Sequence, residues 1–475
     1  MPLQSAFRPE TTHLALGNDF YDIVSPADFP KTILRYRNQR GADQIGLGQL
    51  TDEEWLDHFG RFTPLPGSFS QPLALRYHGH QFRHYNPDLG DGRGFLFAQL
   101  RDDRGRLLDL GTKGSGQTPW SRRGDGRLTL KGGVREVLAT AMLEALGVET
   151  SKSFSLIETG EQLMRGDEPS PTRSSVLVRL SNSHIRIGSF QRLLAMKDAD
   201  GVEKLMNHCV RHYLPEAARD TASEQAVAFL GAVVSRTART TAGWMAAGFV
   251  HGVLNTDNIN ITGESFDYGP YRFLPCYEPG FTAAYFDETG LYAYGRQPEA
   301  IAWNLARLAE CLMLVAPKEM LEPALASFDD QFWAAMRAAM LARLGLASAG
   351  DDADDLLIKA LFSFLYATKA PFEQMMFDLY GGKARLNKAI TSPAASHYAH
   401  AGFAALRAAL AGHEVAAEAQ ALHPYFQREA PVTLLYPEIE MLWSAIDERD
   451  DWSLFEAKLD EIEQVRLAHG IKFTK

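Results

Sequence analysis

His251-Gly-Val-Leu-Asn-Thr-Asp-Asn258 and, a few residues later, Phe266-Asp-Tyr-Gly269 are the two short segments that decide the fold of this 475-residue chain. Asn258 and Asp267 supply an amide oxygen and a carboxylate oxygen. These are the hard ligands that Mg²⁺ and Mn²⁺ prefer. The two segments therefore predict a site at which such a metal ion bridges the phosphates of a nucleotide.

The order of these residues matches the protein-kinase catalytic loop, H-R-D-L-x-x-x-N, followed by the metal-binding Asp-Phe-Gly turn with Tyr268 in place of Phe. The match puts Val253 where a kinase has its base aspartate, and an apolar side chain cannot accept a proton. Asp257 is the nearest carboxylate that can do so, and we expect it to be the catalytic base. A catalytic-loop remnant in an inactive pseudokinase would give the same pattern.

Lys113 and Glu136 occur in the order of the kinase lysine and its helix glutamate. Strand-like runs on both sides of residues 102–105 predict a hairpin whose second strand ends at Lys113. Apolar residues at helical spacing over 134–146, with Gly147 as a stop, place Glu136 on a helix. The ammonium would hold phosphate oxygens while the carboxylate fixes its position, although an ordinary surface lysine fits the same pattern.

Two glycine-rich segments add candidate nucleotide contacts. Gly90 and Gly92, with Arg93 beside them, precede a strand, and glycines there let backbone amides approach a phosphate closely. Asp125 and Gly126 lie in Arg-Arg-Gly-Asp-Gly-Arg. Each segment alone also fits a polar turn without a ligand.

Two arginines, Arg179 and Arg186, bracket Leu-Ser-Asn-Ser-His-Ile. A planar guanidinium group can bind phosphate oxygens through two hydrogen bonds, so both arginines are candidate phosphate ligands. If they pair with surface carboxylates instead, they are surface arginines that bind no ligand. His80 and His84 have no third metal-ligand candidate at a useful spacing, and we interpret them as structural.

The fold class that these patterns predict is α+β, with a protein-kinase-like bilobal core. A strand-rich N-lobe with one long helix precedes a mainly helical C-lobe, and the acidic stretch 348–355 is expected to be an exposed linker. The predicted domains are an N-terminal extension packed on the core, 1–74; the N-lobe, 75–190; the C-lobe with the catalytic and metal-binding loops, 191–347; and a helical C-terminal region, 348–475.

Composition narrows the expected partners and compartment. Lys and Arg number 48 against 59 Asp and Glu, a net charge of −11, which argues against a surface for the nucleic-acid backbone. Cys209, Cys276 and Cys311 have no metal-ligand spacing and suit a reducing compartment. No signal peptide or membrane-spanning apolar run is recognisable. We therefore expect a cytoplasmic protein that binds neither nucleic acid nor membrane.

Taken together, the motifs resemble those of the SelO family, the selenoprotein-O-like pseudokinases, and they extend from about Leu75 to Val315. The matching segments are Tyr77-His-Gly-His-Gln-Phe, Pro87-Asp-Leu-Gly-Asp-Gly-Arg, Lys113-Gly-Ser-Gly-Gln-Thr-Pro, Ser121-Arg-Arg-Gly-Asp-Gly-Arg, Ser183-His-Ile-Arg-Ile-Gly, His251-Gly-Val-Leu-Asn-Thr-Asp-Asn, Phe266-Asp-Tyr-Gly-Pro and Tyr294-Gly-Arg-Gln-Pro. As a set they are far more specific than any one motif. The chain departs from the family at Lys131-Gly-Gly, where Arg-Ser-Ser is common, and glycines there would loosen the start of the helix.

The resemblance implies protein adenylylation: ATP binds in an orientation flipped relative to kinases, and AMP passes to a Ser, Thr or Tyr hydroxyl of a protein substrate, with Mg²⁺ or Mn²⁺. The implied roles are phosphate binding by Lys113 with Glu136, Arg179 and Arg186; lining of the nucleotide pocket by Gly90, Gly92, Arg93, Asp125 and Gly126; metal binding by Asn258 and by Asp267, which also contacts the nucleotide; and base catalysis by Asp257.

Other functions fit the same core. An ordinary protein kinase, a transferase of UMP from UTP and a non-catalytic nucleotide-binding scaffold are the alternatives. Val253 at the base position and the additional arginine pair favour adenylyl transfer over a kinase. The presence of Lys113, Glu136 and Asp267 argues against a scaffold, which could lose them without consequence.

Overall fold

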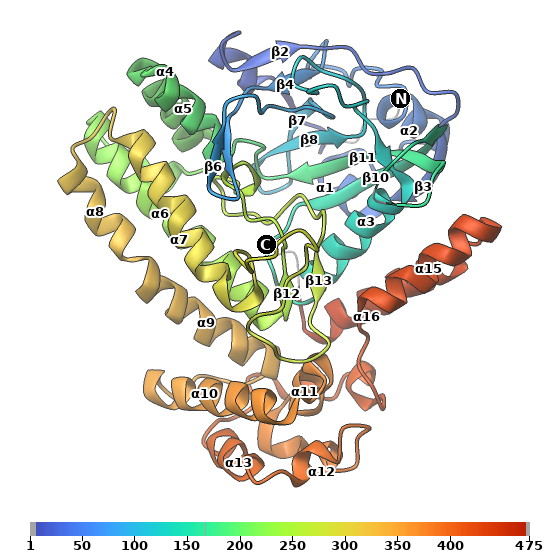
Figure 1. The fold of residues 1–475 in the computed structure, drawn as a ribbon, viewed down its shortest axis with the longest axis vertical. Coiled ribbons are helices and arrows are strands. Elements are labelled where there is room, and N and C mark those ends of the chain that lie inside the picture. Colours follow the sequence, from blue (N-terminus) through green and yellow to red (C-terminus); the bar gives the residue numbers. More distant parts are fainter. Residues whose placement is uncertain (1–5, 167, 472–475) are drawn as a thin grey trace.

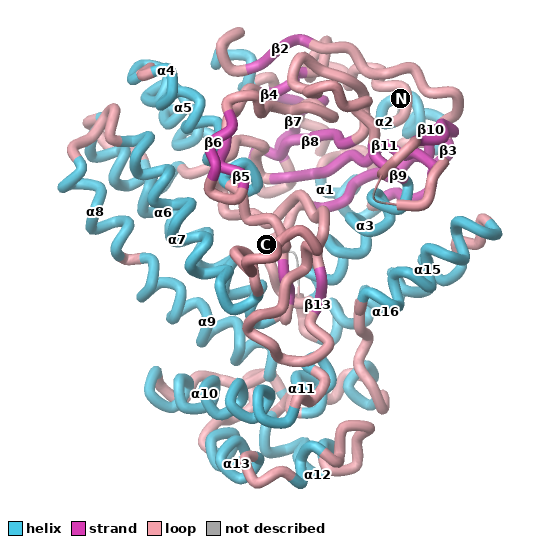
Figure 2. Tube along the Cα trace, in the orientation of Figure 1, coloured by secondary structure: helices cyan, strands magenta, loops and turns pink. Residues whose placement is uncertain are grey.

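An antiparallel nine-stranded sheet forms one end of the molecule, and helices form the other, so the chain is an α+β protein (Figure 1). The computed structural model describes residues 6–166 and 168–471. The ends of the predicted N-terminal extension and C-terminal region, residues 1–5 and 472–475, lie outside the described residues. Figure 2 shows the strands gathered in one half of the molecule, with most of the helices in the other.

Seven strands follow the order β2-β4-β7-β8-β11-β10-β3 across the sheet, while β1 pairs with β7 and β9 with β11. Residues before position 75 therefore contribute strands to this sheet. The sheet strands are β1 Pro9–Glu10, β2 Tyr21–Ile23, β3 Ile33–Arg37, β4 Leu73–Leu75, β7 Leu96–Arg101, β8 Leu107–Lys113, β9 Leu128–Thr129, β10 Lys152–Leu163 and β11 Thr172–Ser181. A short hairpin pairs β5 Gly79–Gln81 with β6 His84–Asn86, and a separate two-stranded antiparallel sheet pairs β12 Phe249–Val250 with β13 Arg272–Phe273.

The hairpin expected around residues 102–105 is confirmed as β7 and β8. Asp102 organises its turn by accepting hydrogen bonds from the backbone amides of Arg104 and Arg106, at 3.0 and 2.8 Å. Every residue of β8 is buried, because the strand lies between β7 and β11 in the middle of the sheet. Lys113 is thus delivered to the interior of the protein at the end of a central strand.

The helix expected after position 134 is confirmed as α3, Leu130–Ala145, and it begins four residues earlier than its apolar pattern. Thr129 caps it by accepting a hydrogen bond from the amide of Gly132 at 3.1 Å. Gly133 is required by packing rather than by flexibility, because a Cβ there would lie 2.4 Å from a methyl group of Leu156. The helix is buried against β10 and β11.

Of the remaining helices, α1 and α2 lie beside the sheet and α4 and α5 next to it, while α9 to α13 form the lower part of the molecule (Figure 1). In chain order they are α1 Gln39–Gln44, α2 Asp52–Phe59, α4 Ile187–Met196, α5 Ala199–His212, α6 Ala222–Ala246, α7 Gln297–Leu312, α8 Lys318–Ala326, α9 Phe328–Leu344, α10 Asp351–Thr368, α11 Phe372–Asp378, α12 Leu386–Ala389, α13 Phe403–Ala411, α14 Glu418–Ala421, α15 Tyr436–Arg449 and α16 Ser453–Ala468. No helix among the described residues is long and apolar enough to cross a membrane.

Residues 348–350 form an exposed connection, as the composition predicts, but the aspartates after them belong to the start of α10 and not to a linker. Asp351, Asp352 and Asp354 lie in the first turn, where the helix dipole favours negative charge. Asp354 is buried, and its carboxylate contacts the ring of His413 at 2.9 Å and accepts the amide of Ala349 at 3.0 Å. A run of aspartates read as a linker was therefore a helix N-terminus.

A buried polar network ties β8 to the helical half of the molecule. Asp109 on β8 accepts hydrogen bonds from Gln99 at 2.8 Å and from the backbone amide of His184 at 2.9 Å. The amide of His13 donates to the same Gln99 at 2.9 Å, and its ring meets that of His208 edge-on. Burial lowers the pKa of His13 to about 4 and that of His208 to about 3, so both rings are neutral in the folded protein.

Acidification should destabilise the fold through these two histidines. Between about pH 6.5 and 4, His13 is protonated in the unfolded chain but neutral in the folded protein. The free energy of unfolding therefore falls as pH falls, by about 1.4 kcal/mol for each unit of pKa difference. His13→Phe should make this slope shallower in urea denaturation measured across that range. The exposed His84→Phe serves as the control, and an unchanged slope in His13→Phe would contradict the assignment.

Candidate active site

The structure brings Lys113, Glu136 and Asp267 together in one buried charge cluster. The ammonium group of Lys113 forms ion pairs with both carboxylates. Lys113 is 5% exposed and Glu136 1% exposed. Arg179, on the neighbouring strand β11, places its guanidinium 3.5 Å from the same oxygen of Asp267. One strand end, one helix and one turn thus converge on a single ammonium group.

Asp267 is ionised in this cluster because neighbouring cations lower its pKa. Burial alone would raise its pKa, but the charges of Lys113, Arg179 and Arg93 outweigh that effect and hold the pKa well below its usual value. Its backbone adopts a left-handed φ of 66°, a conformation that Asp tolerates better than most residues. Asp267 is therefore an anion whose charge is stabilised by three nearby cations.

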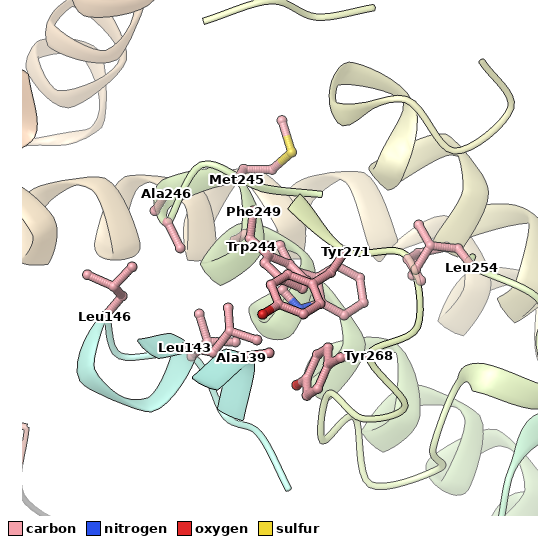
Figure 3. Packing of buried hydrophobic residues seen from close by; sticks show 14 of the residues in the cluster. Ala139, Leu143, Leu146, Trp244, Met245, Ala246, Phe249, Leu254, Tyr268 and Tyr271 are labelled. Carbon is pink, nitrogen blue, oxygen red and sulfur yellow. The ribbon is translucent and has the colours of Figure 1, made fainter. Parts of the chain in front are cut away.

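The turn that carries Asp267 rests on a packed aromatic base. Figure 3 shows Tyr268 and Tyr271 beside Phe249 and Trp244, with Leu143 of α3 close by. The hydroxyl of Tyr268 donates to the Ser265 hydroxyl at 2.7 Å, and the indole nitrogen of Trp244 donates to the same Ser265 oxygen at 2.9 Å. The tyrosine that replaces the kinase phenylalanine therefore anchors the turn by a hydrogen bond as well as by packing.

Asp257 lies in a short 3-10 helix, Thr256–Asn258, that Arg186 fixes in place. One guanidinium nitrogen of Arg186 donates to the backbone oxygen of Asp257 at 3.3 Å and to the hydroxyl of Tyr77 at 2.9 Å. Its other terminal nitrogen pairs with Asp91 at 3.2 Å. Arg186 is itself only 5% exposed, so it positions the backbone next to the candidate base from within the protein.

The side chain of Asp257, the predicted base, is buried and incompletely hydrogen-bonded. It is 7% exposed, and its Oδ1 atom has no hydrogen-bond partner among the described residues. Burial raises the pKa of Asp257 to about 6, although the charge of Arg186 partly opposes the shift. Gly79 makes room for this carboxyl, because a Cβ there would lie 2.9 Å from Oδ1.

A polar cleft of about 650 Å³ joins the carboxyl of Asp257 to the glycine-rich segments. A Cβ on Gly90 would lie 2.3 Å from the Trp120 ring, and Gly126 has a φ of +70°, so both positions require glycine. The sequence-predicted residues that line this cleft are Gly90, Gly92, Arg93, Asp125, Gly126 and Asp257.

The predicted residues thus fall into two groups, the buried charge cluster and the cleft. Asp125 belongs to the cleft and pairs with Arg165 at 2.7 Å. Among the described residues it forms no ion pair with a member of the charge cluster. Arg179 of the cluster and Arg186, which holds the backbone of Asp257, both lie over the ring of Phe266, at 5.6 and 5.2 Å from its centroid. The side-chain nitrogen of Asn258 donates to the backbone oxygen of Val253 at 3.0 Å, which leaves its carbonyl oxygen as a candidate ligand atom.

Sequence analysis missed several residues of the cleft. Tyr77 lines the cleft and, together with Asp91 behind it, holds Arg186, and neither residue was predicted to have a role. Arg122 and Arg123 also line the cleft, and both have a left-handed backbone, with φ of 47° and 70°. The only available signal was their place in Ser121-Arg-Arg-Gly-Asp-Gly, because adjacent arginines in a loop carry no periodicity.

Comparison with known proteins shows the class of protein to which the chain belongs. A family model described as "Protein adenylyltransferase SelO" matches residues 3–463. A protein of Gloeobacter violaceus, named protein nucleotidyltransferase YdiU, is 47% identical over 97% of this chain and 95% of its own length. Proteins of the same name from a Synechocystis and a Bradyrhizobium species are 45% and 38% identical, over 93% and 76% of this chain and 94% and 74% of their own lengths.

The chain is therefore an enzyme of the nucleotidyltransferase class. The family match covers almost all of the chain, and the relatives are matched over most of their own length as well. The chain belongs to the SelO family.

Lys113→Met should weaken nucleotide binding at least tenfold, since it removes the ammonium group and leaves two buried carboxylates facing each other. Isothermal titration calorimetry measures the dissociation constant. Lys131→Met is the matched control: Lys131 lies on the same α3 helix but pairs with Glu440, so nucleotide affinity should stay unchanged. Equal affinities in the two variants would exclude Lys113 from the nucleotide site.

Proposed function

We propose that the chain is a cytoplasmic protein adenylyltransferase with a kinase-like bilobal core, which transfers AMP from ATP to Ser, Thr or Tyr hydroxyls of protein substrates. The observation that carries the proposal is the position of Asp257. It lines the polar cleft and has a free carboxyl oxygen, while the kinase base position is occupied by Val253. A nucleotide in this cleft presents its phosphates beside a base that a kinase does not have.

The proposal includes the ATP orientation that the family resemblance implies, flipped relative to kinases. The buried end of the site holds Lys113, Arg179 and Arg186, three cations suited to the β- and γ-phosphates. The open end is a roomy cleft with close-approach glycines, suited to the adenosine. In this orientation the α-phosphate lies between the two ends, on the side of Asp257.

Asn258 and Asp267 are the residues that would hold Mg²⁺ or Mn²⁺. Their carbonyl and carboxylate oxygens fit these hard cations, which usually complete their coordination with water and phosphate oxygens. When bound, the metal would neutralise charge on the phosphates. The strongly lowered pKa of Asp267 keeps that carboxylate ionised and ready for a cation.

The residues of the chain then divide the work of the transfer. Asp257 accepts the proton of the substrate hydroxyl, whose oxygen forms a bond to the α-phosphorus. The bond from that phosphorus to the bridging α–β oxygen breaks, and pyrophosphate leaves with both electrons. Lys113, Arg179 and Arg186 stabilise the charge that develops on the leaving group, and positioning supplies much of the remaining rate.

Labelled nucleotides test the transferred group directly. Purified protein is incubated with a cell extract, a divalent metal and ATP labelled at either the α- or the γ-phosphate. We expect label on protein only from α-labelled ATP and its loss in Asp267→Ala. Label only from the γ-position would make the enzyme a kinase, and transfer from α-labelled UTP in preference to ATP would make it a UMP transferase. Nucleotide binding without any label would support a scaffold.

Asp257→Asn should reduce the rate of AMP transfer by about 10²- to 10⁴-fold, the usual range for loss of a general base, while nucleotide affinity changes little. Asn has nearly the same shape, so the fold should persist, as a thermal melt can establish. Asp88→Asn, an exposed aspartate before the glycine-rich segment, is the control and should retain activity. A fully active Asp257→Asn enzyme would remove Asp257 from the mechanism.

A further inference from the structure

A second cavity, of about 320 Å³, lies among elements that hold the site and shares no lining residue with the polar cleft. We call it the junction cavity. The β7–β8 turn, the end of α3, the end of β11, helix α6 and the segment before Asp267 all contribute to its wall. Its polar wall includes Arg104, Glu149, Lys152, Asn182, Arg239 and Glu264.

Several charges in the wall already have partners within the protein. Lys152 lies 3.4 Å from Glu144, Arg106 pairs with Asp102, and Arg236 pairs with Glu216 at 2.7 Å. These pairs neutralise one another and need no ligand. They also fix the shape of the wall, since each joins two positions of the chain.

Two cations of the wall are not matched in this way. Within residues 6–166 and 168–471, neither Arg104 nor Arg239 forms an ion pair. The guanidinium of Arg239 donates only to the Ser235 hydroxyl on its own helix, at 3.1 Å. Both groups therefore keep donors for an anion inside the cavity.

Two carboxylates supply negative charge to the wall of the cavity. Glu264 accepts the backbone amide of Asn182 at 2.8 Å, and neither it nor the exposed Glu149 forms an ion pair with a described residue. Desolvation raises the pKa of Glu264 to about 7, against the opposing charges of Lys152 and Arg106. A desolvated carboxyl group without a direct ion pair among the described residues costs stability, which is typical of a group retained for binding.

We propose that the junction cavity binds a small zwitterion of the α-amino-acid type, with its carboxylate on Arg104 and Arg239 and its ammonium group on Glu264. A simple anion would be repelled by the two glutamates, and a simple cation by the two arginines. A zwitterion satisfies both sets at once, and the volume suffices for a molecule of this size.

The position of the cavity gives a bound ligand access to the catalytic elements. Glu264 precedes Asp267 by three residues, and Asn182 follows Arg179 by three. Asn182 and Glu264 are joined by a hydrogen bond, so a ligand on Glu264 touches both segments that hold the buried charge cluster. Binding of a ligand in the cavity is thereby coupled to the geometry of the active site through direct contacts between the two segments.

Calorimetric titration of the full chain with each standard L-α-amino acid tests this proposal, with acetate and methylamine as probes that carry only one of the two charges. We expect at least one amino acid to bind and neither single-charge probe to do so. Glu264→Gln and Arg239→Gln should each weaken that binding about tenfold or more. Absence of binding by every amino acid would overturn the proposal.

Matched variants separate the junction cavity from the nucleotide site and from loss of folding. Arg407→Gln, an exposed arginine on α13, should leave amino-acid affinity unchanged, and Lys113→Met in the buried cluster should leave amino-acid binding detectable, because coupling between the sites changes an affinity without abolishing it. Glu264→Gln retains an oxygen for the amide of Asn182, and a normal melting temperature establishes that it folds. Binding that survives both Glu264→Gln and Arg239→Gln, or that disappears in Lys113→Met, would equally overturn the assignment.

Discussion

One buried ammonium group, that of Lys113, is shared by two carboxylates, and much of the structure is arranged around it. Removing three charged groups from water is costly unless each meets its partners in good geometry. The requirement brings the end of β8, the middle of α3 and the turn at Asp267 to one point. Arg179 from the adjacent strand supplies a further positive charge, so the cluster does not rest on one cation alone.

Such a cluster depends on how firmly α3 is held. The helix is buried along most of its length against the sheet, and its apolar residues meet the aromatic base under the turn (Figure 3). The C-terminal helices hold it from outside: α16 packs on α3, and Lys131 pairs with Glu440 of α15 at 2.7 Å. Asp450, at the end of α15, pairs with Arg173 of β11 at 2.7 Å. The last part of the chain thus stabilises the element that carries Glu136.

Local patterns predicted those elements whose sequence carries a strong period or turn signal. The β7–β8 hairpin and helix α3 follow from alternation, turn composition and helical spacing, and the proximity of Lys113 to Glu136 follows from their order. The acidic start of α10 was misread because aspartates suit both a solvated linker and a helix N-terminus. The glycines after Lys131 do not prevent the helix from starting at Leu130, because Thr129 caps it and Gly133 fits against Leu156.

Contacts between distant segments could not be predicted in the same way. Arg186 was predicted to bind phosphate from its sequence position, but its hydrogen bond to Tyr77, 109 positions away, depends on the tertiary fold. That contact matters for the chemistry, because Arg186 also holds the backbone of Asp257. The proposed base, Asp257, lies four residues beyond the position of Val253, and Arg186, Tyr77 and Gly79 support it there. The position of Asp257 is therefore a property of several segments, of which the loop that carries it is only one.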